Sequence, residues 1–193
     1  MSKKKGSWRN WREWGDAIVF AAIAAIFLRT FFFQMYKIPT TSMVPTLMPG
    51  DKIFVNKLTY GPKIPFTPFR IKGFRKPQRG EVIVFIPPHD RKKAYIKRLI
   101  GLGGDHIVLK EGNVYINGKI AVDPKIARNY YYNQGDYGEE NKEIIVPQGK
   151  YFFLGDNSIS SLDGRFWGFV EEGDIVGKSN FIWWPPKRIG VIE

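Results

Sequence analysis

The strongest hydrophobic pattern is an apolar run near the N-terminus. Residues 17–28 read AIVFAAIAAIFL without a polar interruption. A helix that crosses a bilayer needs about 20 residues, and extending the run to residues 14–33 supplies them, with Asp16 near one end and Arg29 near the other. An arginine one turn from the end can extend its guanidinium to the headgroups. We therefore predict a single transmembrane helix over residues 14–33.

The flanks of this run set its orientation. Residues 1–13 are basic, and Trp8, Trp11 and Trp14 suit an interfacial aromatic belt. Because lysine and arginine lie mostly before the helix, residues 1–13 are expected in the cytoplasm and residues 34–193 outside it. A cleaved secretory signal fits less well, because FLRTFFFQMY offers no pair of small residues for cleavage. An interfacial or buried helix stays open.

The rest of the chain carries strand patterns separated by turns and loops. KIFVNK over residues 52–57 is one such segment, and residues 61–80 form a loop rich in Pro, Lys, Arg and Phe. Residues 105–122 carry two glycine turns and predict consecutive hairpins. Residues 123–142 are polar and tyrosine-rich, which predicts an exposed excursion. Other strands are expected at 81–88, 94–101 and 174–186, and a hairpin at 144–157.

These patterns predict a mainly β fold. The body is expected to be antiparallel and partly closed like a β-barrel, behind one N-terminal transmembrane helix. The 13 prolines and 20 glycines agree with a turn-rich β body rather than a helical bundle. A small insertion is expected around residues 110–150 of the body.

Composition narrows the partners. The net charge of +12 calls for an anionic partner, and +4 of it falls within the first 33 residues. No nucleic-acid motif accompanies the charge, so membrane lipid is the expected partner and nucleic acid is not. Because the chain has no cysteine, disulfides and thiolate metal sites are excluded. No cofactor and no metal are expected.

Few residues are candidates for nucleophilic chemistry. The histidines are His89 and His106, and neither has a distinctive neighbourhood, so a Ser–His–Asp triad is unsupported. A lysine can replace histidine as base where burial keeps it neutral. Lys97 lies on an apolar strand and Ser42 lies in the proline-rich loop IPTTSMVPTLMPG. From the residues alone, Lys97 on a solvated face and Ser42 in turn hydrogen bonds remain alternatives.

Three segments in order carry a family resemblance. They are IPTTSMVPTL at residues 38–47, YIKRLIGLGGD at 95–105 and GDNSISSLDGRFWG at 155–168. Behind an N-terminal apolar helix, these segments resemble the bacterial type I signal peptidases (leader peptidases), a family of serine proteases with a Ser–Lys dyad. The resemblance runs from about residue 14 to residue 184. The chain departs from the family pattern at Thr40 and Gly164, where the family usually has serine, and at Gly103, where it usually has proline.

The resemblance assigns roles to individual residues. It implies Ser42 as nucleophile and Lys97 as general base. The Thr40 hydroxyl, with the backbone N–H of Ser42, would hold the oxyanion, and Ser161 would orient the lysine amine. Four further residues would shape the site from behind it: Asp156, Asn157, Asp163 and Arg165. By matched position, shallow apolar substrate pockets would be lined by Tyr36, Ile38, Met43, Leu47, Tyr95 and Ile96.

The same resemblance implies a function. The chain would be a membrane-bound serine endopeptidase that removes N-terminal signal peptides from secreted preproteins after small residues at −1 and −3, through an acyl-enzyme. It would be a single-pass protein of the bacterial cytoplasmic membrane, with its catalytic domain outside and contact with the secretion machinery. The aromatic residues Phe66, Phe69, Phe74, Trp183 and Trp184 would either touch lipid or pack in the body. The alternatives are a membrane-tethered, non-catalytic β module that binds lipid or partner proteins, and a self-cleaving repressor-type Ser–Lys protease.

Overall fold

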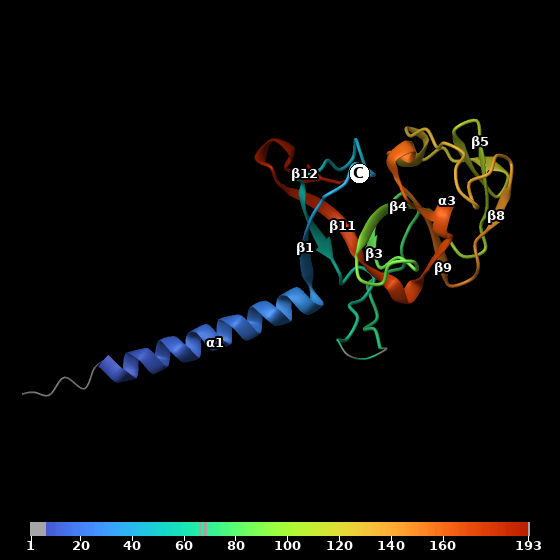
Figure 1. Ribbon diagram of the computed structural model, residues 1–193. Helices are drawn as coiled ribbons and strands as arrows, with labels where there is room; N and C mark the ends of the chain where they lie inside the picture. The colour runs from blue at the N-terminus through green and yellow to red at the C-terminus, as the bar shows by residue number, and fades with distance from the viewer. Residues whose placement is uncertain (1–6, 66, 68, 193) are drawn as a thin grey trace, which may run out of the picture.

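The chain forms one long N-terminal helix and a mainly antiparallel β body (Figure 1). The computed structural model describes residues 7–192 except 66 and 68. The basic residues Lys3, Lys4 and Lys5, and also Phe66, therefore lie outside the described residues, as does the side chain of Trp8.

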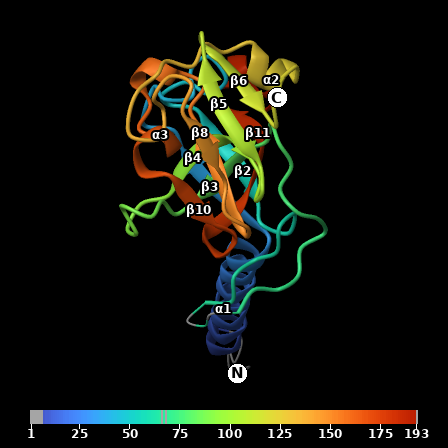
Figure 2. The ribbon, with the colours of Figure 1, turned by 90° about the vertical axis from the view of Figure 1, so that its right-hand side faces the viewer.

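Helix α1 spans Ser7–Phe31 and extends away from the body in both views (Figures 1 and 2). Five alanines in its apolar stretch favour the helix, since alanine has the best helix propensity. Its segment Glu13–Phe31 is long and apolar enough to cross a membrane, and none of that segment is buried against the body.

The end of α1 differs from the sequence prediction. The predicted helix ran to Phe33, but the helix ends at Phe31 and Phe33 opens strand β1. Phe33 pairs with Asn56 of β2 in an antiparallel ladder, so its backbone groups bond across strands instead of along the helix. The Lys57 amine bonds the carbonyls of Arg29 and Thr30 in the last helical turn, which completes the helix end.

The larger sheet has the strand order β1-β2-β11-β3-β4-β9-β10, with β12 paired to β11. Every pairing in it is antiparallel. Within the described residues this order is an open path and not a closed ring. Its strands are β1 Phe33–Lys37, β2 Lys52–Asn56, β3 Val82–Phe85, β4 Tyr95–Gly101, β9 Lys150–Leu154, β10 Phe169–Glu171, β11 Ile175–Trp184 and β12 Gly190–Val191.

A smaller sheet has the order β7-β6-β5-β8. Its strands are β5 His106–Lys110, β6 Asn113–Ile116, β7 Lys119–Ile120 and β8 Glu143–Ile145. The predicted hairpins of residues 105–122 are confirmed, because two-residue turns join β5 to β6 and β6 to β7. The turn residues Glu111, Gly112, Asn117 and Gly118 all have positive φ, as a type I′ turn requires.

The predicted hairpin over residues 144–157 is wrong. Strand β8 pairs with β5 in the smaller sheet, whereas β9 pairs with β4 and β10 in the larger one. The turn between β8 and β9 therefore connects two sheets instead of two neighbouring strands. The two apolar segments do form strands, but an apolar segment alone does not identify its partner strand.

Short helices fill the connections. They are α2 Pro124–Ala127, α3 Gly164–Trp167, and the 3₁₀ turns η1 Ser158–Ser160, η2 Glu172–Asp174 and η3 Pro186–Arg188. The segment predicted as an exposed excursion, residues 123–142, is partly buried. Ile126 and Tyr131 join the apolar cluster around the smaller sheet, so this segment contributes to the core.

Apolar packing on both faces fixes the central strands. In β3, Val82 and Val84 pack into one cluster, and Ile83 and Phe85 pack into another on the opposite face. Strand β4 lies beside β3 and pairs Lys97 with Ile83. The lysine predicted to act as base is therefore held on a central strand that cannot shift register without exposing core residues.

Candidate active site

Ser42 and Lys97 meet across 55 residues of sequence. The Lys97 amine and the Ser42 hydroxyl are hydrogen-bonded, and the side chains are buried, at 4% and 5% exposure respectively. Ser42 lies in the loop between β1 and β2, and Lys97 points from β4. The Lys97 side chain is buried in the protein and not exposed to solvent. The alternative that Lys97 lies on a solvated face of its strand is therefore wrong.

The loop that carries Ser42 is anchored at several points. Met43 and Leu47 are fully buried in the core. The backbone N–H of Asn157 donates to the Ser42 carbonyl at 3.1 Å, and the Asn157 amide donates to the Thr41 carbonyl at 3.2 Å. These contacts fix the Ser42 loop to the segment after β9, so the Ser42 hydroxyl keeps its position relative to β4.

Gly155 makes this approach possible. A Cβ at residue 155 would lie 2.1 Å from the Ser161 hydroxyl and 2.6 Å from the Ser42 carbonyl. Both separations are shorter than van der Waals contact, so any side chain at residue 155 would push the Ser42 loop away.

The environment of Lys97 favours its neutral form. The pKa of Lys97 is lowered from 10.5 to about 8. Burial is the main cause; Asp163 and Asp156 act against it by raising the pKa, and Arg165 adds a smaller lowering effect. Both carboxylates are ion-paired with arginines, Asp163 with Arg165 and Asp156 with Arg98. The arginines therefore keep the two carboxylates from forming an ion pair with the amine.

Asp163 and Arg165 form a buried ion pair. Arg165 Nε donates to Asp163 Oδ1 at 2.9 Å, and both side chains are fully buried. Arg165 also donates to the Tyr132 carbonyl at 2.7 Å and to the Ser158 hydroxyl at 2.6 Å. Asp163 accepts from the Gly155 backbone at 3.0 Å. The pair thus braces the turn that contacts Ser42.

A second buried ion pair was missed. Arg98 donates to Asp156 through Nε at 2.8 Å and through Nη2 at 2.6 Å, with both side chains fully buried. Asp156 also accepts from the hydroxyl of Thr46, which lies in the Ser42 loop. The adjacency of Arg98 to Lys97 was the available signal, since alternation points it to the opposite face of β4.

The hydroxyls of Thr40 and Ser161 were both expected beside the dyad, and only that of Thr40 contacts it. Thr40 Oγ1 lies 3.4 Å from Ser42 Oγ, at the outer limit of a hydrogen bond. Within the described residues the Ser42 backbone N–H donates to no protein group, so it is available to an oxyanion. The Ser161 hydroxyl is buried beside Gly155 but has no hydrogen-bond partner in the described chain, so its expected bond to the amine is not formed in this structure.

A cleft of about 440 Å³ opens at the dyad. Tyr95 and Ile96, both expected to bind substrate, line it together with Ser42, Lys97 and Thr40. Cleft residues not anticipated from the sequence are Pro39, Lys93, Ala94, Ser160 and Leu162, all next to or within the three segments.

The other expected substrate residues lie elsewhere. Ile38, Met43 and Leu47 are buried in the apolar core, and Tyr36 lines a different cavity near α1. The histidines contact Tyr95 and Glu143, so neither is bonded to Ser42. In the part of the chain that is described, no group of three His, Cys, Asp or Glu residues is arranged to hold a metal ion.

Comparison with known proteins identifies the family. Residues 11–184 match the family model described as signal peptidase, peptidase S26. The chain belongs to the signal peptidase I family of serine peptidases. Membership makes it a serine peptidase with signal peptidase I activity, which is the cleavage of signal peptides.

Relatives of this signal peptidase cover nearly its whole length. It is 37% identical to a probable signal peptidase I-2 of Synechocystis, over 99% of this chain and 82% of the relative. It is 35% identical to signal peptidase I T of Bacillus subtilis, over 95% of this chain and 90% of that one. A crystal structure of a signal peptidase I from Enterococcus faecalis is 32% identical with a TM-score of 0.44, and covers 54% of this chain and 97% of that one.

Proposed function

We propose that this chain is a membrane-anchored serine endopeptidase in which Ser42 is the nucleophile and Lys97 the general base. It cleaves signal peptides from secreted preproteins after small residues at −1 and −3. The observation that carries the proposal is the buried hydrogen bond between the Lys97 amine and the Ser42 hydroxyl at the end of an open cleft.

The reaction uses the amine twice. Neutral Lys97 takes the proton of Ser42 as the hydroxyl oxygen attacks the scissile carbonyl. The tetrahedral oxyanion is held by the backbone N–H of Ser42 and the hydroxyl of Thr40. The ammonium of Lys97 then protonates the leaving amine, and an acyl-enzyme remains on Ser42. Lys97 next takes a proton from water, which hydrolyses the ester and restores the hydroxyl.

The flanking residues act by position. Asp156 and Asn157 hold the Ser42 loop, and Asp163 with Arg165 braces the turn behind it. Ser161 orients the amine after a rotation of its unpartnered hydroxyl. Tyr95 and Ile96 give the cleft apolar walls that admit small side chains and exclude large ones. Tyr36, Ile38, Met43 and Leu47 support these walls from behind.

The membrane topology follows from α1. Residues 14–31 span the bacterial cytoplasmic membrane, residues 1–13 stay in the cytoplasm, and the body from β1 to residue 193 lies outside with the smaller sheet as its insertion. The exposed side chains of Phe69 and Phe74 belong to the loop between β2 and β3. That loop extends from the body on the side where α1 ends (Figures 1 and 2). We propose that this loop touches lipid and that the body meets the secretion machinery.

The test uses the purified full chain in detergent with a preprotein. Ser42→Ala and Lys97→Ala should each abolish cleavage. Matched controls are Ser179→Ala, which removes a buried hydroxyl on β11, and Lys92→Ala, which removes an exposed lysine of the turn before β4. Both controls should retain the wild-type rate. Cleavage that persists at the wild-type rate in either dyad variant would refute the proposal.

A further inference from the structure

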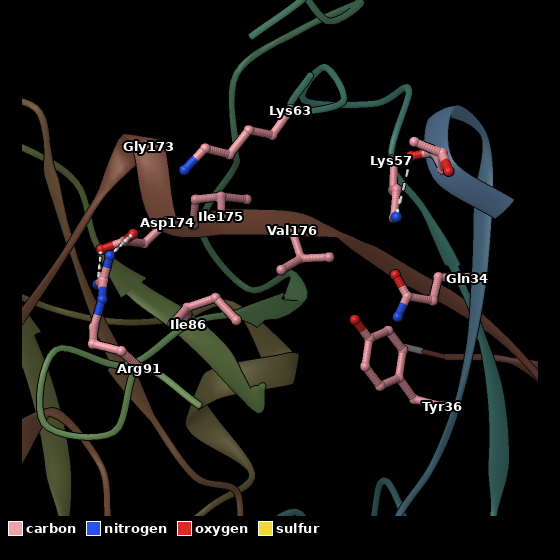
Figure 3. A pocket seen from close by; sticks show the side chains of 11 residues that line it. Gln34, Tyr36, Lys57, Lys63, Ile86, Arg91, Gly173, Asp174, Ile175 and Val176 are labelled. Atoms are coloured by element: carbon pink, nitrogen blue, oxygen red, sulfur yellow. Dashed lines mark hydrogen bonds and ion pairs between the residues drawn. The ribbon is translucent and has the colours of Figure 1, made fainter. Parts of the chain in front are cut away.

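Two adjoining cavities lie where α1 meets the β body, each of about 380 Å³. They share Thr30, Gln34, Lys57 and Lys63 as lining residues. Figure 3 shows the first cavity, with Lys57 and Lys63 on its wall and the pair of Arg91 and Asp174 at one end. These cavities are separate from the cleft at Ser42 and share no lining residue with it.

The charge around the two cavities is unbalanced. Arg91 is neutralised by Asp174 through two bonds of 2.6 and 2.7 Å. Arg29, Lys57 and Lys63 have no ion pair within the described part of the chain. We call these three residues the junction site. Three unpaired cations around one hollow repel one another, and a bound anion would relieve that repulsion.

Lys57 is the innermost of the three. Its amine donates to the carbonyls of Arg29 and Thr30 at 3.1 and 3.2 Å, which leaves one of its three N–H groups unassigned. Burial lowers the pKa of Lys57, and the nearby Arg29 lowers it further. Because the amine already covers the carbonyls at the helix end, an anion at the junction site meets a cation rather than the negative end of α1.

The walls also include apolar surface. Ile26 of α1 and Pro65 line the second cavity beside Arg29 and Lys63. Ile26 belongs to the segment of α1 that has the length and hydropathy of a membrane span. A ligand that contacts both the basic residues and this apolar surface must therefore carry an anionic head and an apolar chain.

We propose that the junction site binds the phosphate headgroup of an anionic glycerophospholipid, whose acyl chain runs along α1 past Ile26. The proposal rests on the membrane anchoring proposed above. The phosphate accepts from Arg29 at the end of α1 and from Lys57 and Lys63 in the loop between β2 and β3. A lipid bound in this way ties the end of α1 to the loop between β2 and β3.

Lipid binding is measured on the full chain in a non-ionic detergent, by native mass spectrometry. The probes are dioctanoyl phosphatidylglycerol, dioctanoyl phosphatidylcholine and inorganic phosphate. Wild type should bind phosphatidylglycerol in preference to the other two. Lys63→Gln should weaken binding about fivefold, and Arg29→Gln combined with Lys63→Gln about 30-fold, because each basic residue at an anionic lipid surface contributes a factor of about five.

The matched control combines Lys110→Gln with Lys119→Gln. It removes the same charge from exposed positions on the smaller sheet and should bind like wild type. Lys57 is left unchanged because it completes the helix end. Inorganic phosphate that binds as tightly as the lipid, equal binding of phosphatidylcholine, or unchanged binding by the double junction variant would each overturn the proposal.

Catalysis is a separate readout. The inactive Ser42→Ala variant should bind lipid like wild type, and the Lys63→Gln variant should still cleave preprotein in detergent. If wild type cleaves preprotein but shows no preference for phosphatidylglycerol, the junction site alone is refuted. If wild type binds phosphatidylglycerol but does not cleave preprotein, the proposed function alone is refuted.

Discussion

At the scale of single residues, Lys97 places catalysis and stability in conflict. Its side chain is buried, and its amine carries no ion pair in the described residues. In the unfolded chain the pKa returns to its ordinary value of 10.5, so below pH 8 the folded state pays for a buried, protonated amine that water solvates well. The proposed role of Lys97 accounts for this cost, because a base must be neutral near its working pH.

This conflict predicts that Lys97→Met stabilises the inactive protein. The folded-state pKa is depressed, so the unfolded chain binds more protons between pH 8 and 10.5, and the penalty is full below pH 8 and absent above pH 10.5. At pH 7 the free energy of unfolding should rise by up to about 3 kcal/mol, less the lost hydrogen bond. Urea unfolding at pH 7 and pH 11 measures it. A gain equal at both pH values would contradict the assigned cause.

Thr40 provides a test of the oxyanion site. Thr40→Val keeps the size of the side chain and removes its hydroxyl, so the cleavage rate should fall about 100- to 1,000-fold, as for loss of one oxyanion donor. Thr40→Ser is the matched control, because it keeps the donor. Single-turnover cleavage of a preprotein measures both variants. A near-normal rate for the valine variant would remove Thr40 from this role.

At the scale of elements, one buried ion pair joins the Ser42 loop, β4 and the turn after β9. Arg98 and Asp156 point from β4 and from that turn, and Thr46 of the loop bonds the same carboxylate. Removing one partner leaves an uncompensated buried charge, which costs about 3–5 kcal/mol. The geometry of the dyad therefore depends on contacts that lie behind it.

Arg98→Met tests this dependence. The variant should lose about 3–5 kcal/mol of unfolding free energy. The unpaired Asp156 should also raise the pKa of Lys97, because that carboxylate already pulls it upward. When the cleavage rate is measured against pH, the pH below which the rate falls should then move to a higher value. A purely structural role of Arg98 would not cause this shift. A destabilised variant whose cleavage rate falls at the same pH as in wild type would contradict the proposed effect of Asp156 on the pKa of Lys97.

Elements that depend on local sequence patterns were predicted correctly. Features that depend on pairing between distant segments were not. The hairpins around Gly112 and Gly118 follow from two-residue turns whose chemistry is local. The hairpin at 144–157 failed because β8 and β9 join different sheets, which no local pattern encodes. In the site, the segments with Ser42 and Lys97 were found by resemblance, but Arg98 was missed since its partner lies 58 residues away. Met43 was expected in the substrate pocket, yet its buried side chain packs in the core.

At the scale of the whole molecule, an exposed apolar helix leads directly into the sheet that carries the site. Strand β1 follows α1 without a linker, and the Ser42 loop follows β1. The body is thereby held next to the end of α1, which suits a substrate whose own signal helix lies in the bilayer. The junction site would add a lipid contact at the same level.

Cysteine labelling tests the proposed orientation, with residues 1–13 in the cytoplasm and the body outside it. The chain has no cysteine of its own, so each introduced thiol is labelled alone. Val122→Cys places a thiol at a position that is 81% exposed on the body. A membrane-impermeant maleimide should label it in intact spheroplasts, whereas Lys4→Cys should be labelled only after permeabilisation. The reverse pattern would place the body in the cytoplasm.

The pH dependence of kcat/KM for preprotein cleavage tests the central claim, a neutral Lys97 acting as base. With a pKa of about 8, the fraction of neutral amine falls as pH falls. The rate should therefore form an acid limb near pH 8 and drop about tenfold per unit of pH below it. A rate that stays constant well below pH 6 would contradict a lysine base and the mechanism built on it.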